Sequence, residues 1–229
     1  MYKRALTVAK LSMRQLNNAY FITGIVLLAM LANYILAFVL GQTGNSTVSF
    51  ANMLIILPIL SAIFIPAQHT RKILNLGAKR RDVWIGAIPV YVIQSAVITL
   101  IMLIFQFTFD RWIIGRGISE LLDVMIVFGF MRHGPVMAFI QMFSFLMLLT
   151  SCIHTLTAAQ DKWYGWVADI VIAAIISVFI PIASLRASLV WFFNLIIFHQ
   201  SALLQVTACL VLGCLIYLLN KPILARKVI

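Results

Sequence analysis

Six apolar runs, each of spanning length, restrict what this chain can fold into. A helix rises 1.5 Å per residue, so about 20 residues cross the roughly 30 Å hydrocarbon core of a bilayer. Inside that core only helices and closed barrels satisfy every backbone hydrogen-bonding group. The runs therefore predict an all-α, polytopic membrane protein with six transmembrane helices. They cover approximately residues 18–40, 51–68, 83–107, 135–157, 163–184 and 201–219.

The composition supports a membrane protein over a water-soluble one. Of the 229 residues 63% are hydrophobic and only 10% are charged, which leaves too little polar surface to cover a soluble globule. The net charge of +11 does not indicate nucleic acid as a partner, because the basic residues cluster at the ends of the apolar runs, where they meet anionic lipid. Residues 1–229 are interpreted as a single transmembrane domain.

The distribution of basic residues predicts the orientation of the chain. With the N-terminus inside, 13 of the 17 Lys and Arg residues fall on the inner side of the membrane and four on the outer side. Loops rich in Lys and Arg stay in the cytoplasm. We therefore expect a multi-pass protein of the cell membrane with both termini in the cytoplasm. Membrane lipid is one expected partner.

Three further segments are apolar but too short or too interrupted to span. Residues 1–17 place Leu6, Met13 and Leu16 at helical spacing among basic residues, which predicts a helix lying on the inner membrane surface. Residues 110–134 carry Glu120 and Asp123 three apart on one helical face, which favours an amphipathic helix on the outer leaflet.

The third segment, residues 184–200, follows Pro181 and comes shortly before the last apolar run. Apolar stretches of this length are typical of re-entrant or interfacial segments, so we predict a helix that dips into the membrane and returns. The alternative is one long, tilted last helix over about residues 189–219.

The connection at residues 70–82, TRKILNLGAKRRD, holds five of the 17 basic residues between two apolar runs. Its pattern predicts a short amphipathic helix that stops at Gly77, where a positive φ is inexpensive. Such an element can dock a partner on the cytoplasmic side. The alternative is that these cations only fix the orientation of the chain.

One acidic residue lies within a predicted span. Asp169 is about 9 Å beyond the membrane edge at Lys162, and His154 lies at a similar depth on the preceding run. An ion in lipid needs a partner, so we predict that Asp169 pairs with His154 or with a basic residue of the first segment such as Arg14. A structural pair, or a carboxylate reaching water, is favoured over a substrate or proton site.

No enzymatic or nucleotide-binding motif is present in the sequence. It has no HExxH, no GxSxG and no GxxxxGK[ST] loop, so ATP and magnesium would have to be bound by another subunit. The three cysteines have no disulfide or metal-site spacing. We expect no catalytic residue, no cofactor and no metal in this chain.

The chain resembles the ABC-2 type permeases, the membrane subunits of ATP-binding-cassette exporters. The resemblance rests on the amphipathic first segment, the segment between the last two runs, and above all the loop LNLGAKRRDVWIG. In that family the loop forms a coupling helix that sits in a cleft of the ATPase. The run that matches the family pattern is Leu76, Gly77, Ala78, Lys79, Arg80, Arg81 and Asp82. The resemblance implies that the ATPase-coupling residues of this chain are Arg71, Lys72, Leu74, Leu76, Gly77, Lys79, Arg80, Arg81 and Asp82.

This resemblance implies an exporter built from two permease chains, identical or paralogous, and two ATPase subunits. Among family members the chain is most similar to bacterial exporters of antimicrobial or cytolytic peptides, including the phenol-soluble-modulin type. An exported amphipathic substrate is therefore expected, with a lipid-linked or drug-like molecule as the alternative. The rival from another class is a channel or membrane scaffold that needs no ATPase.

Overall fold

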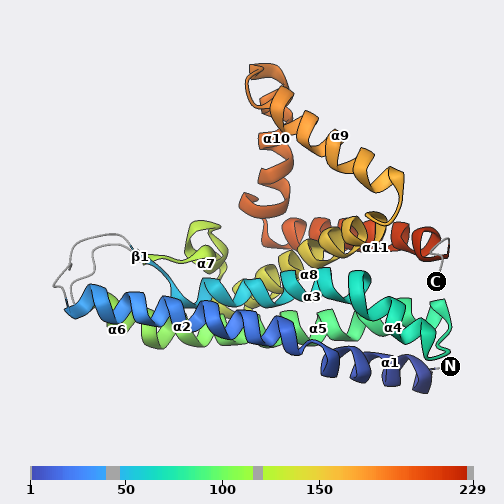
Figure 1. Cartoon of the computed structure of the whole chain (residues 1–229). Coiled ribbons are helices and arrows are strands. Elements are labelled where there is room, and N and C mark those ends of the chain that lie inside the picture. Colours follow the sequence, from blue (N-terminus) through green and yellow to red (C-terminus); the bar gives the residue numbers. More distant parts are fainter. Residues whose placement is uncertain (1, 40–46, 116–120, 226–229) are drawn as a thin grey trace.

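The computed structural model describes residues 2–39, 47–115 and 121–225, and these are almost entirely helical (Figure 1). The predicted all-α class is confirmed. Glu120 and the basic tail residues Arg226 and Lys227, which entered the predictions above, lie outside the described residues.

The elements follow one another in a simple order. The first half of the chain contains α1 (Tyr2–Gln15), α2 (Asn17–Val39), β1 (Thr47–Val48), η1 (Phe50–Ile55), α3 (Ile56–Phe64), η2 (Ile65–His69), α4 (Thr70–Asn75), α5 (Arg80–Phe105), η3 (Gln106–Asp110) and α6 (Arg111–Ile114). The second half contains β2 (Leu121–Leu122), α7 (Val124–Val127), η4 (Phe130–His133), α8 (Pro135–Ala159), α9 (Trp163–Phe179), α10 (Ala183–Phe193), η5 (Asn194–Phe198) and α11 (Ala202–Ala225).

Several helices are long and apolar enough to cross a membrane. In the described ranges there are five, with the bounds Asn17–Leu36, Phe50–Asn75, Arg80–Ile114, Pro135–Ala159 and Ala202–Leu224. The remaining predicted span corresponds to α9, which is bent by 118° against the following helix at Ile180–Ile182. The molecule is thus built as a membrane-embedded helical protein with five such helices, or six if the bent pair counts as one span.

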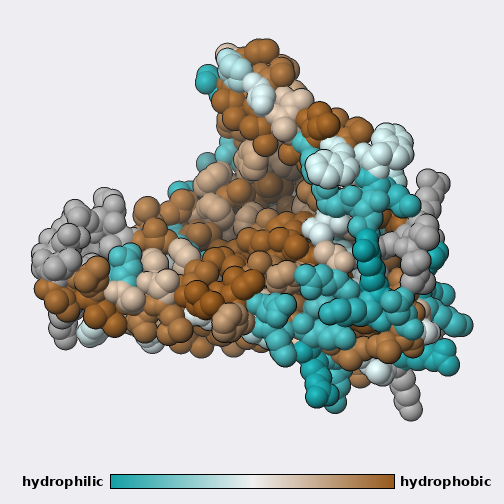
Figure 2. All heavy atoms as spheres, in the orientation of Figure 1, coloured by the Kyte–Doolittle hydropathy of each residue, from teal (hydrophilic) through white to brown (hydrophobic). Residues whose placement is uncertain are grey.

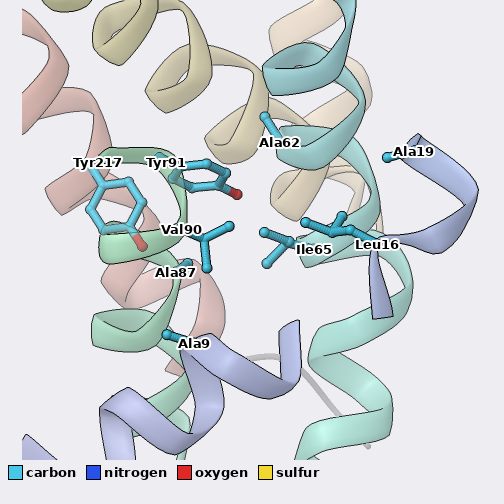
Figure 3. Packing of buried hydrophobic residues seen from close by; sticks show 9 residues of the cluster. All are labelled: Ala9, Leu16, Ala19, Ala62, Ile65, Ala87, Val90, Tyr91 and Tyr217. Carbon is cyan, nitrogen blue, oxygen red and sulfur yellow. The ribbon is translucent and has the colours of Figure 1, made fainter. Parts of the chain in front are cut away.

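The body of the molecule is organised around α8. This helix packs along α11 and also against α3 and α5, while α1 packs along the first half of α5. Figure 3 shows part of the core, where Leu16, Ile65, Val90, Tyr91 and Tyr217 from four different parts of the chain point toward one another. The first turn of α1, the α4–α5 turn and the last turn of α11 lie at one end of the body (Figure 1).

Helices α9 and α10 form a V-shaped hairpin that stands away from the body (Figure 1). Helix α10 continues through η5 to Phe198, and α11 begins only at Ala202. The alternative of one continuous last helix from about residue 189 is therefore wrong. The re-entrant position of this segment in the bilayer stays a prediction.

The prediction of one amphipathic helix within residues 110–134 is also wrong for the described residues. Leu121–Leu122 pairs in parallel with Thr47–Val48, and only two short helical turns, α7 and η4, follow. Gly129 and Gly134 interrupt the helix with φ values of +75° and +86°. Asp123 does not lie on an exposed helical face but is buried, and its side chain caps α7 by accepting a hydrogen bond from the Met125 backbone N–H.

Candidate functional site

The basic connection forms a tight turn between two long helices. Residues Phe50–Asn75 form one continuous helical rod, so α4 is the end of that rod and not a separate coupling helix. The backbone N–H of Gly77 donates to the Leu74 carbonyl at 2.9 Å, and that of Ala78 donates to the Ile73 carbonyl at 3.3 Å. This is the Schellman arrangement, which requires the positive φ of +85° at Gly77. The predicted helix stop at this glycine is confirmed.

The apolar residues of the turn point in two directions. Ile73 and Leu74 are buried together with Val83 of α5 and Val8 of α1. Leu76, in contrast, is 72% exposed at the tip of the turn, three residues before the run of cations that begins at Lys79. A large exposed apolar side chain beside several cations is a feature that a partner protein can bind.

Helix α1 supplies a second wall beside this turn. Its buried residues include Ala5, Val8 and Ala9, which recur at helical spacing and face α5. The approach is close at Gly86 of α5, where an added Cβ would lie 2.8 Å from Val8 Cγ1 and 3.0 Å from the Ala5 carbonyl oxygen. Leu6, which the sequence pattern placed on the apolar face, is 54% exposed.

A cleft of about 430 Å³ lies between α1 and the turn. Its lining is apolar at Val8, Leu11 and Ile73 and carries the cations Arg4 and Lys79. Asp82, which is buried in the first turn of α5, also lines it, at a place where the helix dipole favours a negative charge. The α1 residues of this cleft were not among the predicted site residues. The feature of the sequence that could have indicated this wall is the helical spacing of the small apolar residues Ala5, Val8 and Ala9.

The five predicted coupling cations do not form one patch. Arg71 forms an ion pair with Asp161 at 2.9 Å, which ties the start of α4 to the α8–α9 turn, and Lys72 is exposed. Lys79 lines the cleft beside α1. Arg80 and Arg81 line a different hollow, together with Lys221 of α11. The exposed Arg71–Asp161 pair adds little stability, but it links helix α4 to the α8–α9 turn.

The predicted pair of His154 and Asp169 does not form. His154 is buried, and its Nδ1 lies 2.6 Å from the Tyr91 hydroxyl of α5. Asp169 accepts a hydrogen bond of 2.5 Å from the side-chain amide of Gln160. The physical reason is that α8 turns His154 toward α5, whereas α9 diverges from the body and is buried only at Gly165. The alternative partner Arg14 is not joined to Asp169 by any ion pair among the described residues.

Within the described residues, no three His, Cys, Asp or Glu side chains gather as a group that could hold a metal ion. Comparison of the chain with protein-family models, with curated proteins and with solved structures finds no match. A functional conclusion therefore depends on the residues and geometry described above.

Proposed function

We propose that this chain is the permease subunit of an ATP-driven exporter of the ABC-2 type, working with a separate ATPase subunit and a second permease chain. The observation that carries the proposal is the α4–α5 turn. It holds Leu76 in an exposed position at the end of a long helical hairpin, beside a cleft with cationic and apolar walls. The bacterial cell membrane, with both termini in the cytoplasm, is part of the same proposal.

The turn is suited to transmit motion. It joins the rod Phe50–Asn75 to α5 through two backbone hydrogen bonds, and Ile73 and Leu74 fasten it to α1. A force on Leu76 would therefore move both long helices and α1 together, because packed elements shift as rigid bodies. ATP binding and hydrolysis in the partner would supply that force.

The decisive variant is Leu76→Asp, with Asn75→Asp as its matched control. Both residues are exposed neighbours and both changes add one negative charge. We expect the tagged wild-type chain, purified in mild detergent from its native host, to bring down an ATPase with a Walker A loop. Leu76→Asp should reduce the recovered ATPase about tenfold or more, as loss of an interface anchor does, and Asn75→Asp should not.

Two results would overturn this proposal. One is recovery of the chain without any ATPase at every detergent strength, which would favour a channel or scaffold. The other is equal recovery of the ATPase with Leu76→Asp and with the wild type. Helical content, measured by circular dichroism, verifies that each variant is folded.

For the substrate, we propose an amphipathic peptide. The support is the resemblance to peptide exporters together with the low content of charged residues, 10% of the chain. The surface of the body and of the α9–α10 hairpin is apolar over wide areas, with hydrophilic residues gathered near the end that carries the α4–α5 turn (Figure 2). The test is ATPase activity of the purified complex with added cytolytic peptide. Stimulation by an amphipathic helix and none by a scrambled peptide supports a peptide exporter. Stimulation only by lipid-linked or drug-like molecules would replace this substrate class.

A further inference from the structure

The hollow that contains Arg80 and Arg81 and a second, apolar hollow both lie between α5 and α11 and both have Trp84 in their walls; the two together are called the α5–α11 groove. Helix α11 packs along α8 over much of its length but meets α5 at few points, and α8 contributes Met147 and Ser151 to the apolar hollow. Trp84 of α5 and Tyr217 of α11 stack across it with ring centroids 5.5 Å apart. The Tyr217 hydroxyl also donates to the Trp84 carbonyl at 2.7 Å. This contact divides the groove into two compartments that share Trp84.

The compartment nearer the chain termini is cationic. It has a volume of about 460 Å³, and Arg80, Arg81 and Lys221 line it with no acidic side chain among its described lining residues. All three cations are exposed. Converging Lys and Arg side chains at the edge of a membrane helix pair attract anionic head groups. Trp84 also lines this compartment, and tryptophan is enriched at the interface between membrane and water.

The deeper compartment is apolar. It has a volume of about 270 Å³, and its walls include Ile88, Met147, Leu210 and Cys214. The lining hydroxyls are already engaged, since Tyr91 contacts His154 and Tyr217 bonds to Trp84. The third, Ser151, donates to the Met147 carbonyl at 2.7 Å. A polar ligand would thus find few hydrogen-bonding groups here, whereas a hydrocarbon chain needs none.

The two compartments together have the chemistry of one lipid. From Lys221 to Leu210 the groove follows α11 for eleven residues, or about 16 Å, from the cationic edge into the apolar interior. We propose that it binds an anionic phospholipid of the leaflet on the side of the termini. Its head group lies on Arg80, Arg81 and Lys221, and one acyl chain lies between α5 and α11 against α8.

This proposal does not depend on transport or on an ATPase. Its central variant, Lys221→Gln, lies outside the α4–α5 turn and outside the predicted coupling residues. Lys10→Gln is the matched control, because Lys10 is an exposed cation of α1 that does not line the groove. Cys214→Phe tests the other compartment, since Cys214 is exposed and lines the apolar part.

The experiment is a titration of the full-length chain in non-ionic detergent with phosphatidylglycerol or phosphatidylcholine carrying brominated acyl chains. Bromine quenches the fluorescence of nearby tryptophans, and the part of the quenching that Trp84→Phe removes reports on the groove. We expect saturable quenching at a concentration at least tenfold lower for phosphatidylglycerol, because three cations face the head group. Lys221→Gln should weaken phosphatidylglycerol binding about fivefold, and Lys10→Gln should not change it.

Two further variants keep the test decisive. Trp84→Phe should remove most of the saturable quenching, and Cys214→Phe should weaken binding of both lipids, because its ring would fill the acyl compartment. Equal affinity for the two lipids would overturn the proposal. So would an affinity for phosphatidylglycerol that is unchanged in both Lys221→Gln and Cys214→Phe.

Discussion

Helices α8 and α9 follow one another in the chain and are both strongly apolar, but they differ in what covers them. Helix α8 buries 12 of its 25 residues within the chain, whereas α9, which is also fully described, buries one of 17. The buried positions of α8 include Ser144, Thr150 and Ala158, which are small or polar. The exposed face of α9 carries Ile172 and Ile176. Hydrophobicity therefore marks the membrane, while small and polar residues mark helix contacts.

The largest expected effect tests this contrast directly. Leu146 of α8 is fully buried in the core, whereas Ile172 of α9 is 41% exposed. We expect Leu146→Ala to lower the free energy of unfolding by about 2–4 kcal/mol because it leaves a cavity. Ile172→Ala should lower it by less than about 0.5 kcal/mol. Unfolding by SDS in mixed micelles, followed by circular dichroism, measures both. Similar losses for the two variants would mean that the hairpin is packed as tightly as the body.

The next effect concerns the contact between α1 and α5. Gly86→Val introduces atoms where Val8 Cγ1 already lies 2.8 Å from the position of a Cβ, so we expect a loss of about 1–3 kcal/mol. Gly24→Val on α2 is the matched control, because nothing lies within 4 Å of its Cβ position. The same unfolding measurement applies. If Gly86→Val were as stable as Gly24→Val, the packing of α1 on α5 would be contradicted.

A smaller effect is expected at the polar contact inside the body. Tyr91→Phe removes the hydroxyl that lies 2.6 Å from His154 Nδ1 and leaves a buried imidazole with one partner fewer. Hydrogen bonds between membrane helices contribute about 1 kcal/mol, so we expect a loss of that size. Tyr20→Phe, on the half-exposed side of α2, is the control and should be neutral. A neutral Tyr91→Phe would indicate that His154 bonds elsewhere.

The smallest effect is a pH dependence at Asp123, the residue before α7. Burial raises the pKa of Asp123, although the hydrogen bond from the Met125 backbone N–H lowers it in part. Because the pKa of this carboxyl is raised in the folded state, the protonated carboxyl stabilises the folded protein at low pH. This stabilisation is lost as the pH rises through the pKa of the folded state. Asp123→Asn, which also caps a helix, should remove this dependence and stabilise the protein at pH 7 by less than about 1 kcal/mol. An identical pH profile for the variant and the wild type would contradict this.

The sequence was sufficient to predict the helical class and the ends of several elements. The run at residues 135–157 became Pro135–Ala159, and Gly77 ended its helix because glycine alone adopts a φ of +85° without strain. Both results depend on local information. Apolar length and a glycine after a helical pattern are visible in a single sequence.

What could not be predicted depends on how helices are rotated and where they diverge. Their similar distance from the predicted membrane edge suggested that His154 and Asp169 could meet. The rotation of α8 instead turns His154 toward Tyr91. The same limit applied to α1, whose buried face contains Val8 instead of Leu6. The five cations of the basic connection are close in sequence, yet their side chains separate because the turn directs Arg71 and Arg81 to different neighbours.

The most direct test of the proposed docking at the α4–α5 turn is photo-crosslinking from position 76 in native membranes. A photoreactive amino acid replaces Leu76, which is 72% exposed, and a second sample carries it at Leu203, an exposed residue near the start of α11. We predict a crosslink from position 76 to a soluble ATPase with a Walker A loop, and none from position 203. Crosslinks from position 76 only to lipid or to proteins outside the cell would contradict the proposal.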